Sequence, residues 1–244
     1  MRNFSFSRFM FWAGLTFLYL PMFILVIYSF NESRLVTVWA GWSTKWYGEL
    51  FQDTQIMGAV KRSLEVAFLS ATSAVFFGML SSWAMVRIAK FRGKTLFGGM
   101  ITAPLVMPDV IIGLSLLLLF VAFTQLTGWP RERGMLTIWI AHTTFGMAYA
   151  TVVISSRLRE MDASIEEAAM DLGAPPLKVF FAITLPLIAP AVASAWLLAF
   201  TLSLDDVVIA SFVTGPGATT LPIEVLSSVR RGVSPKINVL ASLI

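Results

Sequence analysis

The sequence predicts an all-α protein that crosses a membrane several times, and three observations support this. Hydrophobic residues make up 57% of the 244 residues and charged residues only 13%, well below the roughly 25% of an ordinary soluble domain. The mean hydropathy is +0.79. Apolar runs long enough to cross a bilayer, which takes about 20 residues, recur along the chain. We therefore expect one transmembrane domain over residues 1–244.

The first two apolar runs predict one helix each. Residues 9–30 carry no charge. They exceed the apolar core of about 7–15 residues found in a signal peptide, and no small-residue cleavage site follows them, so they predict a retained helix. Residues 31–58 are amphipathic and rich in tryptophan, a composition suited to the membrane interface. The second predicted helix is centred on residues 66–86.

The next apolar stretch is too long for one straight crossing. Asp109 is the only charged residue between residues 95 and 130. At 1.5 Å per residue, a straight helix of this length exceeds the roughly 30 Å hydrocarbon thickness. Pro104 and Pro108 each remove a backbone donor and crowd the preceding turn, so they predict a bend or break there.

The remaining chain predicts two more crossings and the start of another. The fourth helix covers about residues 135–155 and the fifth about 187–210, followed by a short interfacial helix over 223–231 and the start of a sixth over 237–244. This last stretch is too short to cross a bilayer, so we expect the protein to continue beyond it. Lysine and arginine are equally numerous on the two predicted faces, and charge counting leaves the orientation open.

A polar hairpin, residues 156–186, separates the fourth and fifth predicted helices. Ser164 with Glu167 three positions later predicts an N-cap and capping box. Gly173 supplies the left-handed residue that ends a short helix. Two prolines then favour a second short helix, 177–183. Its apolar surface leaves two interpretations open with equal weight, an interfacial hairpin and an element that docks on a partner.

The hairpin carries a long spaced motif. Glu167-Ala168-Ala169, three residues, Gly173, nine residues and then 183–186 (ITLP) fit the pattern EAA-x3-G-x9-I-x-L-P. This resembles the EAA loop of the permease subunits of bacterial ABC importers. The resemblance implies a cytoplasmic loop whose coupling helix sits in a groove of an ATP-binding subunit. The loop residues concerned are Glu167, Ala168, Ala169, Gly173, Lys178, Phe180, Ile183 and Pro186.

The resemblance covers nearly the whole chain and is strongest to the polyamine branch, in particular to permeases of putrescine importers. It rests on stretches such as ITAPLVMPDVIIGLSLLLLF and LAFTLSLDDVVIASFVTGPGATTLP. It implies a type I permease of six helices in the bacterial inner membrane with both termini cytoplasmic. It also implies four kinds of partner: a second, non-identical permease, two copies of an ATPase, a periplasmic binding protein and a polyamine. ATP and Mg²⁺ are then bound by the ATPase, with no cofactor in this subunit and no nucleic acid partner.

Motifs of enzymes are missing from the sequence. The nearest approach to a phosphate-binding G-x-x-x-x-G-K-[ST] is 93–95, but Ile88 stands at the first glycine position. No nucleophile elbow, zinc-binding helix or cysteine occurs, so an intramembrane hydrolase or metalloenzyme has no support. We expect His142 to be a packed or hydrogen-bonded helix residue. A scaffold or insertase, a third class, does not require acids within apolar spans.

Acids do interrupt the apolar spans. Asp109 and the pair Asp205-Asp206 lie about 22 Å and 28 Å from the inner ends of their helices, and such costly groups are functional by default. A cap for Asp109, and solvation or pairing with Arg230 or Arg231 for the other two, are equally weighted alternatives. Carboxylates suit a diammonium solute, as do aromatic faces. The candidate pathway residues are Asp109, Asp205, Asp206, Tyr149, Phe145 and Trp196. The residues do not separate putrescine from spermidine, and another small cationic solute stays an alternative.

Overall fold

The computed structural model describes residues 3–36, 38–88, 90–232 and 234–243. Within these ranges the regular elements are helices, and an isolated bridge joins Asn31 and Trp42. The predicted all-α fold is confirmed. Two compact units occur, residues 1–59 with 224–244 and residues 60–223, and the single domain stays a prediction. Five described helices have the length and apolar composition of membrane spans, Phe6–Ser29, Thr54–Arg87, Asp109–Thr127, Met135–Glu160 and Pro176–Asp205.

The first unit contains α1 (Asn3–Ser29), α2 (Lys45–Gln52) and α12 (Pro235–Leu243). The tryptophan-rich connection is held by side-chain bonds, because the Trp46 indole donates to the Asn31 carbonyl at 2.8 Å and is buried. The Tyr47 hydroxyl lies 2.8 Å from Ser29 Oγ, at the end of α1. These bonds order a segment that composition alone described only as amphipathic. The helix after it, α3 (Thr54–Arg87), begins within the predicted connection.

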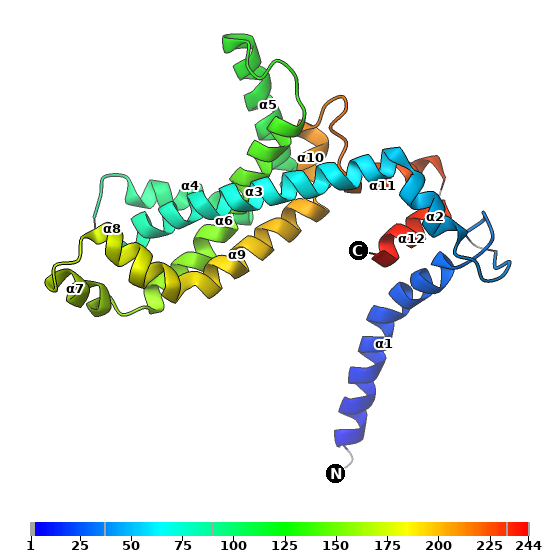
Figure 1. Cartoon of the computed structure of the whole chain (residues 1–244), viewed down its shortest axis with the longest axis horizontal. Helices are drawn as coiled ribbons and strands as arrows, with labels where there is room; N and C mark the ends of the chain where they lie inside the picture. Colours follow the sequence, from blue (N-terminus) through cyan, green and yellow to red (C-terminus); the bar gives the residue numbers. More distant parts are fainter. Residues whose placement is uncertain (1–2, 37, 89, 233, 244) are drawn as a thin grey trace. The chain divides into compact units, whose positions relative to one another are not determined.

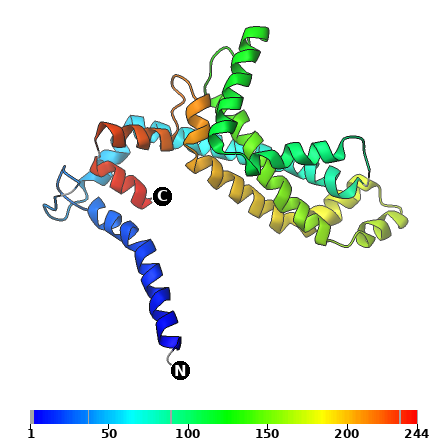
Figure 2. The same ribbon diagram turned by 180° about the vertical axis from the view of Figure 1, so that it is seen from behind.

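The second unit is built on α3, α6 (Met135–Glu160) and α9 (Leu185–Asp205), which run alongside one another (Figures 1 and 2). Small residues lie where these helices meet. A Cβ added at Gly78 would lie 2.7 Å from Ala150 Cβ, and one at Gly146 would lie 3.1 Å from Ala74 Cβ. Such residues let helix backbones approach closely, which is how helices associate where lipid offers no hydrophobic driving force. These contacts form the frame of the unit.

The long apolar stretch breaks as predicted, but at one proline only. It forms α4 (Lys94–Val106) and α5 (Asp109–Thr127). Met107 is extended, with φ −84° and ψ 139°, because the ring of Pro108 disfavours helical geometry in the preceding residue. Pro104 lies inside α4, so the helix does not end at this proline. Beyond the break, α5 packs on α10 (Val208–Val213), where Gly113 meets Phe212.

The predicted boundaries after the hairpin are wrong in two places. The helix α8 (Pro176–Val179) continues through a π-helical turn, η1 (Phe180–Thr184), directly into α9. The separate short helix over 177–183 therefore does not exist, because a π turn accommodates the missing N–H of Pro186 without ending the helix. At its other end α9 stops at Asp205 and not near residue 210. The predicted interfacial helix is α11 (Leu221–Arg231), and α12 begins the next apolar stretch; residue 244 of that prediction lies outside the described residues.

The close contact at Gly78 generates a prediction. Gly78→Ala should lower the free energy of unfolding of the assembled protein by about 1–3 kcal/mol, because the new methyl meets Ala150 and the backbone of Thr151. The control is Gly99→Ala, where nothing lies within 4 Å of the added carbon and the better helix former should be neutral or stabilising. The measurement is thermal unfolding of the purified complex in detergent. Equal transition temperatures for the two variants would contradict the close contact.

Candidate functional site

Gly173 ends the first helix of the EAA loop, the segment 156–186, in the predicted left-handed conformation. The helix is α7 (Ser164–Asp171), and Gly173 has φ +86°. The Ala174 N–H donates to the Ala169 carbonyl at 3.1 Å, and the Gly173 N–H donates to the Met170 carbonyl at 2.8 Å. This is the bond pattern of a Schellman motif, which reverses the chain at a helix end. The predicted left-handed conformation of Gly173 is confirmed, and its role in coupling stays a prediction.

The start of α7 differs from the prediction. Ser164 is the first helical residue and not the N-cap, and its N–H donates to the Asp162 carboxylate at 2.9 Å. This bond lowers the pKa of Asp162, so its contribution to stability exists above the ordinary aspartate pKa and is lost as pH falls through the lowered value. The capping box with Glu167 is wrong, because the helix begins one residue earlier than that pattern requires. Glu167 is exposed.

Glu166, the preceding residue, is the buried acid of the loop. Its side chain is 9% exposed, and its Oε2 lies 2.9 Å from Nε of Arg87, the last residue of α3. The Thr184 hydroxyl, fully buried at the end of the π turn, donates to Glu166 Oε1 at 2.6 Å. One carboxylate therefore joins α7 to both α3 and the segment that leads into α9. The sequence analysis did not predict a role for Glu166. The signal it offered was Arg87, a positive charge at the end of an apolar helix that requires an acidic partner.

The far side of the loop presents apolar side chains to its surroundings. Leu172 is 90% exposed, Leu177 75% and Phe181 63%, and Lys178 stands among them, exposed. Phe180 instead turns inward, with its ring 5.2 Å from that of Trp83 on α3. Ala168 and Pro186 are exposed, while Ala169 and Ile183 are half-buried. Glu166 and Phe180 thus attach the loop to α3, while Leu172, Leu177 and Phe181 stay exposed.

A buried histidine lies toward the other end of the second unit. His142 of α6 is 4% exposed, with Nδ1 2.6 Å from Ser203 Oγ and Nε2 3.2 Å from Asp206 Oδ2. Asp206 also accepts the N–H groups of Ile209 and Ala210 at 3.2 and 2.7 Å. The expectation of a hydrogen-bonded His142 is confirmed. Asp206 is a shared acceptor that joins α6 to the first turn of α10.

Two of the three predicted pathway acids are free of such contacts. Asp205 and Asp109 are exposed, and neither side chain forms a hydrogen bond or ion pair with another side chain within the described ranges. Asp109 is the first residue of α5 and Pro108 is the N-cap, so the cap alternative for Asp109 is wrong. Asp109 lies one helical turn, about 6 Å along the axis, before Gly113, which contacts Ile209 of α10. The packing therefore places the start of α5 near the segment that follows Asp205.

The predicted aromatic residues fall in two groups. Phe145 and Tyr149, both on α6 and half-buried, pack edge to face at 5.1 Å. Trp196 of α9 donates from its indole N–H to Thr72 of α3 at 3.1 Å and stacks on Phe200 at 5.2 Å. No ring contact joins the two groups in the part of the chain that the structure describes. The pathway roles of all six predicted residues stay predictions.

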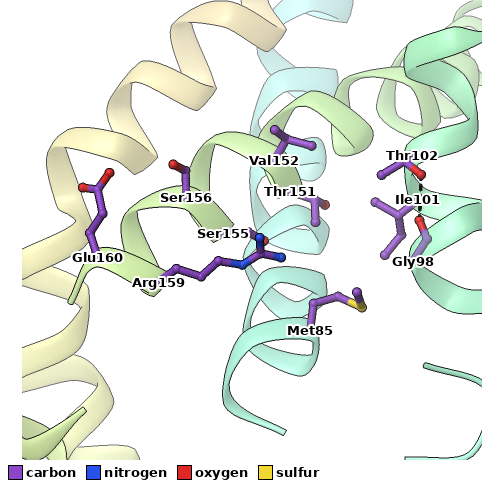
Figure 3. Close-up of a pocket in the computed structure, with 10 residues that line it drawn as sticks. All are labelled: Met85, Gly98, Ile101, Thr102, Thr151, Val152, Ser155, Ser156, Arg159 and Glu160. Atoms are coloured by element: carbon purple, nitrogen blue, oxygen red, sulfur yellow. Dashed lines mark hydrogen bonds between the residues drawn. The ribbon is translucent and has the colours of Figure 1, made fainter. Parts of the chain in front are cut away.

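A cavity of about 550 Å³ opens between α3, α4 and α6, beside the C-terminal end of α6 (Figure 3). Hydroxyl groups line much of it, and the Thr102 hydroxyl is bonded to the Gly98 carbonyl at 3.0 Å. The sequence analysis singled out none of its residues. The lining residues are Met85, Gly98, Ile101, Thr102, Thr151, Val152, Ser155, Ser156, Arg159 and Glu160.

Residues 74–232 match the family described as binding-protein-dependent transport system inner membrane component. The chain belongs to this family. The match includes the EAA loop, His142 and the three acids predicted to line the pathway. Together with the five candidate spans, it makes the chain a multi-pass inner membrane protein of the permease kind, in agreement with the sequence prediction.

Curated relatives of the chain are polyamine permeases. The chain is 69% identical over 231 residues to the putrescine transport system permease protein PotI of Escherichia coli K12, covering 95% of this chain and 82% of the relative. It is 42% identical to the spermidine/putrescine transport system permease protein PotC of the same organism, covering 93% of this chain and 84% of the relative. The family and branch expected from the motifs are confirmed.

Solved structures share the fold at low sequence identity. A chain of a bacterial ABC transporter involved in the import of the acidic polysaccharide alginate superposes with a TM-score of 0.72 at 15% identity, covering 99% of this chain and 90% of that one. A chain of an amino acid ABC transporter with histidines gives a TM-score of 0.56 at 16% identity, covering 81% and 89%. The predicted type I permease fold is confirmed.

Gly173 provides a test of the loop geometry. Gly173→Val should reduce transport, because a β-branched residue at φ +86° is strained although space for its Cβ is open. Gly173→Asn should be milder, since asparagine tolerates left-handed geometry. The measurements are solute uptake and co-purification of an ATPase with each variant. Normal values for both quantities in Gly173→Val would mean that this turn does not position the loop.

Proposed function

We propose that this chain is a membrane-spanning subunit of an ATP-driven importer that moves a polyamine, in the first place putrescine, into the bacterial cytoplasm. The observation that carries the proposal is the 69% identity to a putrescine permease over nearly the whole chain. The lower identity, 42%, to a spermidine/putrescine permease favours putrescine over spermidine. An importer for another small cationic solute is the alternative.

The proposed complex contains this chain, a second non-identical permease, two ATPase copies and a periplasmic binding protein. The exposed apolar side chains of the EAA loop, Leu172, Leu177 and Phe181, are the kind of surface that a partner covers. The ATPase would bind ATP and Mg²⁺ and meet this loop in the cytoplasm, with both termini of the chain on the same side. A related fold was solved as an alginate transporter in complex with a substrate-bound periplasmic protein, which supports the binding protein.

Carboxylates are the groups through which this chain would handle a cationic solute. A diammonium compound loses hydration when it enters the space between helices, and a nearby carboxylate offsets that cost more strongly than it could in water. Asp109 and Asp205 are exposed and have no partner side chain among the described residues, so their charges are available. Asp206 already contacts His142 and accepts an N–H group of α10. It would act mainly by shaping the pathway, as would Phe145, Tyr149 and Trp196.

The charge argument predicts selective loss of transport. Asp109→Asn and Asp205→Asn keep the side-chain shape and remove the charge, so putrescine uptake should fall at least about tenfold, equivalent to about 1.4 kcal/mol. Assembly and basal ATP hydrolysis should be retained. Uptake is measured in proteoliposomes that contain the complex and its binding protein, at matched amounts of complex. The control is Glu65→Gln on α3, which breaks only an exposed ion pair with Lys61. Parent-level uptake in both single variants and in the double variant would leave the charge argument without support.

Energy conversion by a partner predicts that the isolated chain hydrolyses no ATP. The sequence carries no phosphate-binding loop, so activity should appear only when the ATPase is added, and should then require that subunit's own catalytic residues. The measurement is phosphate release by the purified chain, alone and in the complex. Sustained hydrolysis by the isolated chain, at a rate that survives further purification, would contradict the proposal.

A further inference from the structure

Glu166 of the EAA loop makes two buried polar contacts. One carboxylate accepts from Thr184 at 2.6 Å and pairs with Arg87 at 2.9 Å. Arg87 is the last residue of α3, and Thr184 closes the π turn that leads into α9. The three residues come from three elements of the same unit. A displacement of α7 therefore acts on both helices through this one side chain.

The buried charge of Arg87 makes it costly to separate this residue from Glu166. The Arg87 side chain is 16% exposed, and its Nε and Nη2 are both buried without a hydrogen bond among the described residues, so Glu166 compensates it as an ion pair. Removing the carboxylate charge would leave this guanidinium buried and uncompensated, which is costly. The free energy therefore favours a closed contact, in which α7, α3 and the π turn move together.

The π turn makes the orientation of α8 sensitive to this contact. The turn holds one residue more than an α-helical turn, and such insertions concentrate at functional sites. Conversion of the turn to α geometry would rotate α8, including Lys178 and Leu177, by about 100° about the axis of α9. The bond from Thr184 to Glu166 links this turn to α7. The same bond therefore helps to set which face of α8 is exposed.

We propose that Glu166 is a positioning residue that transmits movement of the EAA loop to α3 and α9 through Arg87 and Thr184. The inference rests on the proposed function, because it assumes that an ATPase moves the loop. It differs from the role implied by the EAA motif, whose own glutamate, Glu167, is exposed. Loss of the Glu166 contact should uncouple ATP hydrolysis from transport. The ATPase and the periplasmic binding protein should still bind.

The experiment measures putrescine imported per ATP hydrolysed in proteoliposomes containing the complete complex and its binding protein. Glu166→Gln should lower this ratio about 5- to 10-fold, within the range of a typical coupling between sites. Thr184→Val removes only the hydroxyl and keeps the side-chain shape, so it should lower the ratio in the same direction. Thr184→Ser keeps the hydroxyl and should restore the ratio toward that of the parent. Glu65→Gln, an exposed glutamate on α3, is the matched control.

The ratio distinguishes positioning from folding. A purely structural role would reduce the amount of complex and would leave import per ATP in the remaining complex at the parent value. That parent value in Glu166→Gln or in Thr184→Val overturns the inference, as does a Thr184→Ser variant impaired as much as Thr184→Val. If Glu166→Gln does not assemble, the two Thr184 variants decide the question.

If the proposed solute is wrong, the experiment gives a result that differs from failure of the Glu166 inference. A parent complex that imports no putrescine would refute the substrate, but its ATP hydrolysis could still be stimulated by the binding protein. The inference then predicts that this stimulation is reduced about 5-fold or more in Thr184→Val, while hydrolysis without the binding protein stays at the parent rate. Unchanged stimulation would overturn the inference independently of the solute.

Discussion

Inside a lipid bilayer every backbone N–H and C=O group must find its partner within the protein, and the second unit is shaped by this requirement. Continuous helices satisfy it except where they break. At the helix interruption, the N-cap of α5 is Pro108, a residue that has no N–H to satisfy. The interruption after Asp205 is closed by the Asp206 carboxylate, which accepts two N–H groups of α10. The third irregularity, the π turn before Pro186, keeps one helix continuous.

Close helix contacts then fix the positions of these irregular points. Gly78 and Gly146 allow α3, α6 and α9 to approach one another at small side chains, and Ser82 donates across the contact to the Thr151 carbonyl at 2.9 Å. Packing of this kind depends on shape, since the surrounding lipid is as apolar as the side chains. A small displacement of one helix is therefore transmitted to the others where these close contacts lie.

The sequence predicted features that depend on single residues and missed features that depend on spatial neighbours. Gly173 and Pro108 were predicted correctly, because left-handed geometry and the loss of a donor are properties of glycine and proline themselves. Hydropathy likewise located the spans. The pairing of Glu166 with Arg87 joins residues far apart in the chain, and neither position shows a periodicity that marks it. The π turn was missed because Pro186 alone indicates an end, while its accommodation depends on the whole turn.

Helix α9 connects two polar clusters of the second unit. At one end Thr184, directly before α9, holds Glu166 and hence the EAA loop. Near the other end Ser203 of α9 contacts His142 of α6, which contacts Asp206 beside the exposed Asp205. The buried bond between Ser203 and His142 resists separate movement of α6 and α9, because breaking it would leave unpaired groups. A rigid helix between the two clusters carries movement along its length, so a shift of the loop would reach the acids without any chain of flexible contacts.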